Sequence, residues 1–189
     1  MNSQTHALIA AALLGRRSFR RKDHIALLSG ALIPDAFMLV FILYAGVTRL
    51  DMTTMWGITY WQEPWQSFSA LSNSALLYGA IFIIGLWVSP LWRLFALGAL
   101  LHVGVDYLTH AEDAHRHFWP LTDWRFHSPI SYWDVKHFGQ WVSLFEAILG
   151  VGLTILLWRR GTAKWVKVIF ILAGLAYLAI PLFWVISFG

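Results

Sequence analysis

ALLYGAIFIIGLWVSPLWRLFALGALLHVGVDYL, residues 75–108, is the stretch that decides the fold class. It contains two apolar runs, residues 75–88 and 91–108, separated by Ser89-Pro90. Proline has no backbone N–H and fits the first turn of a helix, so it is expected to end one helix and begin the next. The stretch therefore predicts two consecutive membrane spans that run in opposite directions.

The composition extends this interpretation to the whole chain. Hydrophobic residues make up 58% of the 189 residues and charged residues 13%, with a mean hydropathy of +0.59. Soluble domains are much more polar, so we expect an integral membrane protein. The length leaves room for one integral membrane domain, residues 1–189. There is no cysteine, so a bound metal would need nitrogen and oxygen ligands.

Three more apolar runs, residues 25–47, 141–158 and 165–188, are long enough to cross a bilayer. The apolar segment 5–14 is too short to span and predicts a short helix. Residues 48–72 are aromatic and polar, which is typical of an interfacial loop. The expected fold is therefore all-α: a polytopic membrane helix bundle of about five spans plus a short N-terminal helix.

The basic residues predict the orientation of these spans. When successive spans alternate in direction, ten of the 14 lysines and arginines fall in loops on one side and four on the other. The side richer in lysine and arginine is the cytoplasmic side. The polar loops, including residues 110–140, are then expected to face the periplasm or cell exterior. The clustering of basic residues beside apolar runs explains the high pI, so no nucleic-acid partner is favoured.

Asp35 stands in the middle of an apolar run, directly after Pro34. An ionisable group at membrane depth costs roughly a few kcal/mol and is usually paired, metal-bound or functional. The proline frees backbone groups, so the helix can bend around whatever the carboxylate binds. The simpler alternative is a carboxylate that caps a half-helix or pairs with a buried basic residue. Glu146, in a later apolar run, needs a partner for the same reason.

His102, Asp106 and His110 are spaced four residues apart. On an α-helix this spacing puts all three side chains on one face. Imidazole and carboxylate are suitable ligands for Zn²⁺, Mn²⁺ or Fe²⁺, so the spacing predicts a metal site. A hydrogen-bonded His/Asp pair between two helices is the alternative.

A polar run follows His110 and contains Asp113, His115, Arg116 and His117. We interpret these four as candidate catalytic residues: an acid or base for proton transfer and, in Arg116, a group that steadies developing charge. A solvated loop is the alternative. The aromatic sequence that follows predicts a folded cap over the site, in which Arg125 is a second candidate to hold an anionic group.

Several of these motifs, in this order, resemble the YdjM-like family of predicted membrane-bound metal-dependent hydrolases. The resemblance covers residues 5 to about 121 and rests on Thr5-His6, Leu32-Ile33-Pro34-Asp35, Ser72-Asn73-Ser74, His102-x3-Asp106 and Phe118-Trp119-Pro120. A bacterial branch of similar proteins carries the block AEDAHRHFWPLTDWRFHSPISYWD, residues 111–134. The family is in turn distantly similar to the zinc phospholipase C and single-strand nuclease superfamily.

The resemblance implies a set of metal ligands and a reaction. The resemblance implies His6, Asp35, Asn73, His102 and Asp106, and with His110 from the helical spacing they make the predicted ligand set. Asn73 departs from the family pattern, which has histidine there, and an amide oxygen binds a metal less tightly than imidazole does. The implied cofactor is a divalent metal, zinc or else manganese, and the implied reaction is phosphoester hydrolysis by metal-activated water.

The expected location is the bacterial inner membrane, with the site toward the periplasmic face. A site under an aromatic cap within the bilayer favours a phospholipid or other amphiphilic phosphoester as substrate. Two alternatives stay open: a non-enzymatic membrane protein that binds or passes a metal ion or proton through the His/Asp cluster, and a metal site that only stabilises the bundle.

Overall fold

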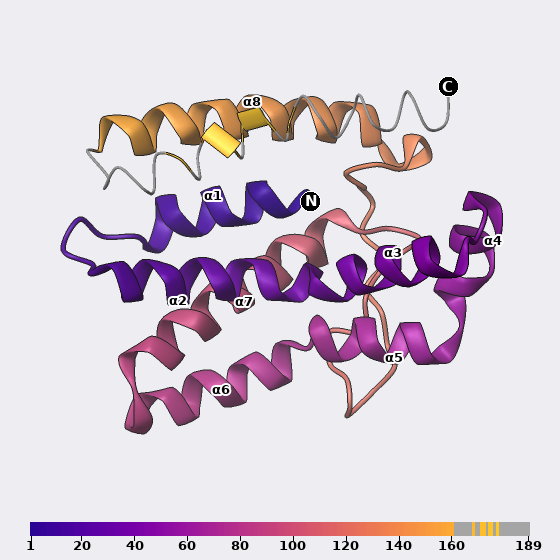
Figure 1. Cartoon of the computed structure of the whole chain (residues 1–189), viewed down its shortest axis with the longest axis horizontal. Helices are drawn as coiled ribbons and strands as arrows, with labels where there is room; N and C mark the ends of the chain where they lie inside the picture. Colours follow the sequence, from indigo (N-terminus) through magenta and orange to yellow (C-terminus); the bar gives the residue numbers. More distant parts are fainter. Residues whose placement is uncertain (161–167, 169–170, 173, 176, 178–189) are drawn as a thin grey trace.

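The computed structural model describes residues 1–160, 168, 171–172, 174–175 and 177, and every regular element within them is helical (Figure 1). Four helices are long and apolar enough to cross a membrane: Arg21–Thr48, Glu63–Val88, Pro90–Thr109 and Gly139–Arg159. The shorter helix α1 (Ser3–Leu14) precedes them. The prediction of an all-α membrane bundle with a short N-terminal helix is confirmed. The fifth predicted span, residues 165–188, lies outside the described residues.

The first long helix has a joint in its middle. It consists of α2 (Arg21–Leu32), the 3-10 turn η1 (Ile33–Asp35) and α3 (Ala36–Thr48). Pro34 cannot donate a backbone hydrogen bond, and the chain tightens into the 3-10 turn at this point. The 3-10 turn places the Asp35 carboxylate at the junction of two helices, and the bend of the helix around it stays a prediction.

The prediction of an interfacial loop for residues 48–72 is wrong for its second half, which is helical. The segment forms α4 (Met52–Gly57), the turn η2 (Thr59–Trp61) and α5 (Glu63–Ser72), which is followed after a break at Asn73 by α6 (Ala75–Val88). Polar residues in α5, including Gln66 and Ser69, hide the helix from a hydropathy pattern because they are buried against other polar groups.

The break between α6 and α7 (Pro90–Thr109) is where Ser89-Pro90 predicted it. The Ser89 hydroxyl accepts a hydrogen bond from the Leu91 N–H, and Pro90 occupies the first turn of α7. α7 then crosses α2 at very short range (Figure 1). A Cβ at Gly30 or Gly98 would collide with a backbone oxygen of the other helix, so these glycines permit the close approach.

Helix α1 lies between α2 and α8 (Gly139–Arg159), with its first residues directed toward the end of α7 (Figure 1). Its apolar residues are buried against Leu28 of α2 and Leu157 of α8. The helix is thus too short to span but is part of the core. This position carries His6 to the interior of the bundle.

Residues 110–138 form a largely irregular segment that lies against α5 and the end of α7, with one short turn, η3 (Val135–His137). Backbone hydrogen bonds fix it in place, from Ser128 N to His110 O (3.0 Å), Tyr132 N to Thr109 O (3.1 Å) and Ala75 N to His117 O (2.8 Å). Irregular backbone within a membrane protein requires such internal partners. We call residues 110–138 the polar segment.

Candidate metal centre

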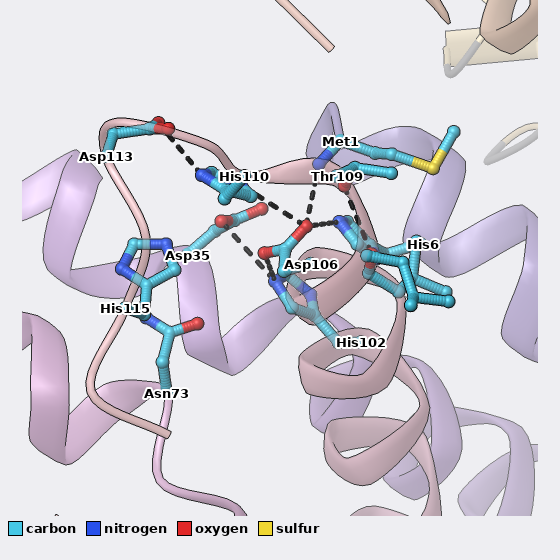
Figure 2. A network of polar contacts seen from close by, with 12 residues as sticks. Met1, His6, Asp35, Asn73, His102, Asp106, Thr109, His110, Asp113 and His115 are labelled. Carbon is cyan, nitrogen blue, oxygen red and sulfur yellow. Dashed lines mark hydrogen bonds and ion pairs between the residues drawn. The ribbon is translucent and has the colours of Figure 1, made fainter. Parts of the chain in front are cut away.

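Side chains from four parts of the chain meet at the end of α7 (Figure 2). They form two groups of possible metal ligands, and within each group one ligand atom per residue lies within 4.8 Å of the others. The first group is His6, Asp35 and His102, and the second is Asp106, His110 and His115. Five of the six predicted ligands are thus brought together, joined by His115.

Asp106 lies at the centre of both groups and is 1% exposed. Its Oδ2 is 2.9 Å from His102 Nε2, while its Oδ1 is 3.0 Å from His6 Nε2 and 3.5 Å from His110 Nε2 (Figure 2). The amino group of Met1 also donates to Oδ1, at 2.7 Å. One carboxylate is therefore shared by three imidazoles.

His102 presents an unprotonated nitrogen to this carboxylate when the ring is neutral. Its Nδ1 donates a hydrogen bond to the Ala31 carbonyl oxygen at 2.7 Å, so the proton of a neutral ring is on Nδ1. Nε2 then directs a lone pair toward Asp106, and toward Asp35 Oδ1 at 3.6 Å. Neither contact has hydrogen-bond geometry, and among the described residues the buried atom has no hydrogen-bond partner. A lone pair that faces two carboxylates is satisfied either by a proton on Nε2 or by a bound metal cation.

His6 has the same unmet requirement. Both of its ring nitrogens are buried, and neither has a hydrogen-bond partner among the residues that the structure describes. The ring stacks on His102 with the centroids 3.6 Å apart and an angle of 15° between the planes. Two stacked imidazolium cations would repel each other, so protonating both rings is an unfavourable way to satisfy the carboxylates.

His110 belongs to the second group, but it is not on the helical face where the spacing placed it. α7 ends at Thr109, and His110 has an extended backbone. The prediction of three ligands on one helix is therefore wrong for His110, although the side chain still reaches Asp106. Its Nδ1 pairs with Asp113 Oδ2 at 2.8 Å, and the Trp133 indole N–H donates to the same oxygen.

The His110–Asp113 pair has the arrangement in which a carboxylate orients a metal-binding histidine. Burial lowers the pKa of His110, but the charge of Asp106 and the bonds to both carboxylates outweigh it and raise the pKa to about 9. Burial raises the pKa of Asp113, yet the bonds from His110 and Trp133 hold it at about 2. Asp113, a predicted catalytic residue, thus lies where it positions His110.

His115 is buried, and its Nδ1 lies 2.9 Å from the hydroxyl of Ser69 on α5. Burial and the neighbouring His110 hold its pKa well below the usual value. The neutral ring is the form that binds a metal. His115, predicted as an acid or base, therefore also has the position and the neutral form of a possible metal ligand.

Asn73 and His117 lie on the other side of His115. The His117 Nδ1 donates to the Asn73 backbone oxygen at 3.1 Å, and the side-chain nitrogen of Asn73 donates to the backbone oxygen of Ser69. The Asn73 side-chain oxygen is buried near His115 and has no hydrogen-bond partner among the described residues (Figure 2). It is therefore available as an acceptor or ligand.

Arg116 connects the polar segment to α5. Its Nη1 donates to Glu63 at 3.0 Å and to Asp123 at 2.9 Å. Arg125 donates to the Ala114 carbonyl oxygen and to Gln66. Both arginines hold the segment in place, and their predicted contact with an anionic substrate stays a prediction.

Several residues that position the ligands escaped sequence reasoning. Ser3 donates to Asp35 Oδ2 at 2.5 Å, and Ser69 and Ala31 orient His115 and His102. Isolated serines and a backbone carbonyl have no recognisable pattern. Glu146 of α8 finds the partner it needed, since its Oε1 accepts from Thr5 and from the Asn2 N–H and so ties α8 to the start of α1.

The fold and the site define a helical membrane protein with a buried His/Asp cluster that could hold a metal ion. No protein-family model, no curated protein and no solved structure matches the chain. The resemblance to the YdjM-like family therefore stays a prediction.

Proposed function

We propose that the protein is a membrane-bound hydrolase that uses one or two divalent metal ions, zinc or manganese, to cleave a lipid-like phosphoester. The observation that carries the proposal is the set of buried imidazole nitrogens at His6 and His102 that face carboxylate oxygens without hydrogen bonds. A divalent ion between them satisfies nitrogen and oxygen together. It also avoids two stacked imidazolium cations.

The donor set fits a divalent ion well. Imidazole and carboxylate, with no thiolate, suit zinc and manganese. The His102 and His110 rings donate hydrogen bonds to the Ala31 carbonyl oxygen and to Asp113, which orients them in a way that is common around bound metals. Asp106 can serve both groups, through Oδ2 toward the first and Oδ1 toward the second.

The two sides of the cluster differ in access, and this difference favours catalysis over a stabilising metal. His6, His102 and Asp106 are sealed. Asp35, His110 and His115 instead line a pocket of about 310 Å³. A catalytic metal site keeps one position open, whereas a structural site is closed.

A bound divalent ion supplies a nucleophile by lowering the pKa of a water molecule. In the hydrolysis, the water oxygen bonds to phosphorus, the bond from phosphorus to the leaving oxygen breaks, and that oxygen takes up a proton. Two histidines, His115 and His117, were candidates to donate this proton. His115 belongs to the second ligand group, so His117 is the one that is left for this role. Its ring centroid is 5.8 Å from that of His115.

The test is the metal content of the detergent-purified protein by mass spectrometry, after purification without chelators. We expect the wild type to carry zinc or manganese and His102→Ala and Asp106→Asn to lose it. His127→Ala is the matched control, because His127 is exposed and belongs to neither ligand group. Phosphate release from a phosphoester is then measured on the loaded protein.

Each result has a clear meaning. If the wild type is metal-free even after zinc or manganese is added back, the hydrolase proposal fails and the cluster is a proton-binding network. If metal binds but no phosphoester is cleaved, the protein is a metal-binding membrane protein without this activity.

A further inference from the structure

The pocket beside the metal centre has two chemically different walls. One wall is the start of α1, and another is the first part of α3; Asp35, His110 and His115 of the metal centre also line the pocket. The lining residues on α3 are Phe37, Met38, Leu39 and Ile42. The pocket therefore joins a polar end to an apolar side.

The apolar side opens toward lipid. Leu39 is 61% exposed and Ile42 is 48% exposed, and both lie in the apolar helix Arg21–Thr48 that is long enough to cross the membrane. Exposed leucine and isoleucine on such a helix are the residues that meet acyl chains. A molecule in the bilayer can thus reach Asp35, His110 and His115 without leaving the membrane.

The polar end offers groups for an anionic head. The Gln4 side-chain nitrogen is buried and has no hydrogen-bond partner within the described part of the chain, although Gln4 lines the pocket. An amide N–H there can donate to a phosphate oxygen. Together with metal ions held by the two ligand groups, it makes this end complementary to a phosphate.

The size of the pocket limits what can enter. A volume of about 310 Å³ is at the lower end of the roughly 300–1,000 Å³ of small-molecule sites. It can take a small head and the first part of a chain, but not a whole lipid. The remainder of the molecule must stay in the bilayer.

We propose that this site is entered sideways from the bilayer by a lipid phosphate with a small head, whose chain leaves along Met38, Leu39 and Ile42. This proposal rests on the proposed function, because bound metal ions provide most of the positive charge for the phosphate. It adds the route of access and the residues that select for an apolar chain.

The experiment uses zinc-loaded protein in nanodiscs that contain a trace of phosphatidic acid with a photoreactive acyl chain. Phosphatidylcholine with the same chain is the reference lipid, and adducts are located by peptide mass spectrometry. We expect the adduct ratio of phosphatidic acid to phosphatidylcholine to be several-fold higher at residues 37–42 than at Ile83 and Ile84. Those two residues of α6 are 52% and 56% exposed but are not part of the pocket lining.

Two variants sharpen the result. Leu39→Trp fills the mouth of the pocket and should abolish the excess of phosphatidic acid adducts at residues 37–42. Leu43→Trp is the matched control on the same helix, because Leu43 is 60% exposed and does not line the pocket. It should keep the excess.

Equal adduct ratios at both places, or an excess that Leu39→Trp does not change, would overturn sideways access. The proposed function can fail separately. A specific adduct without phosphate release leaves a lipid-phosphate binding site without hydrolysis. Hydrolysis of a water-soluble phosphoester without a specific adduct leaves a hydrolase that is entered from water.

Discussion

The two ligand groups of the metal centre are built in different ways. His6, Asp35 and His102 come from three separate helical elements and meet only because α1, α2 and α7 pack closely. Asp106, His110 and His115 follow one another along the chain, from the last turn of α7 into the polar segment. The first group therefore depends entirely on helix packing, whereas the second depends on the fold of one continuous segment and on its contact with Ser69 of α5. Substitutions should therefore affect the two ligand groups differently.

The largest expected effect is the loss of both groups when the α2–α7 contact is broken. Gly98→Leu places a side chain against the Leu27 oxygen and the Ala31 nitrogen, and overpacking of this kind should cost about 3 kcal/mol or more. We expect a clear fall in the thermal unfolding midpoint in detergent and no bound metal. The control is Gly104→Ala on the same helix, where an added Cβ meets nothing within 4 Å. Equal midpoints for Gly98→Leu and wild type would contradict the close helix contact.

Asp106→Asn should abolish tight metal binding by both ligand groups without unfolding the bundle. The amide keeps the shape of the side chain but removes the charge that three imidazoles share. We expect metal affinity to fall by at least about 100-fold, or roughly 3 kcal/mol, as for other broken buried charge pairs. His115→Ala is the comparison, because it removes a ligand of the second group alone. Titration with zinc should show no tight site in Asp106→Asn and one tight site in His115→Ala; identical isotherms would mean that Asp106 is not shared.

Asp113→Asn should weaken only the second group. It removes the carboxylate that orients His110, and such partners typically contribute 10-fold to 100-fold to metal affinity, as an order of magnitude. Asp134→Asn is a matched control, since Asp134 bonds His137 Nδ1 at the same 2.8 Å but lies outside both groups. The measurement is the zinc affinity of each site. A loss in the first group as well would show that the two groups are not independent.

The second group should also respond to pH in a defined direction. His110 has a pKa of about 9 in the metal-free site, so at pH 7 its ring carries a proton that a metal ion must displace. Affinity should therefore rise with pH up to about 9, by about tenfold per unit, and fall as the pH is lowered. Calorimetry in buffers of different ionisation enthalpy should detect about one proton released per zinc bound at pH 7. Binding without proton release would show that His110 is not a ligand.

The difference between the two ligand groups also explains which parts of the site could be predicted from the sequence. The His102 and Asp106 positions follow from helical spacing, and the joint at Pro34 follows from the chemistry of proline. The prediction that His110 is helical is wrong, because no local sequence signal shows that α7 ends at Thr109. Helix α5 was missed because its polar side chains face the polar segment rather than water, a contact that only the tertiary structure creates.

Positioning residues were beyond prediction for a related reason. Ser69 and Asp113 act through the residue that they touch, and the contact of Ser69 with His115 joins residues 46 positions apart. A serine in a polar helix has no feature that marks such a partner. His6, by contrast, was named only through the family resemblance, since a lone histidine near a terminus carries little information by itself.

The short helix α1 has a consequence for how the protein is assembled. Twelve residues are too few to be held in a bilayer as a span, so α1 gains its stability only from neighbouring helices. One neighbour is α8, whose Leu157 and Glu146 contact α1 and which is synthesised more than a hundred residues later. Docking of α1 against α2 and α7 can come first, but its contacts with α8 can form only after that helix has been made. Because α1 carries His6, the last packing contacts around the first ligand group are added at this step.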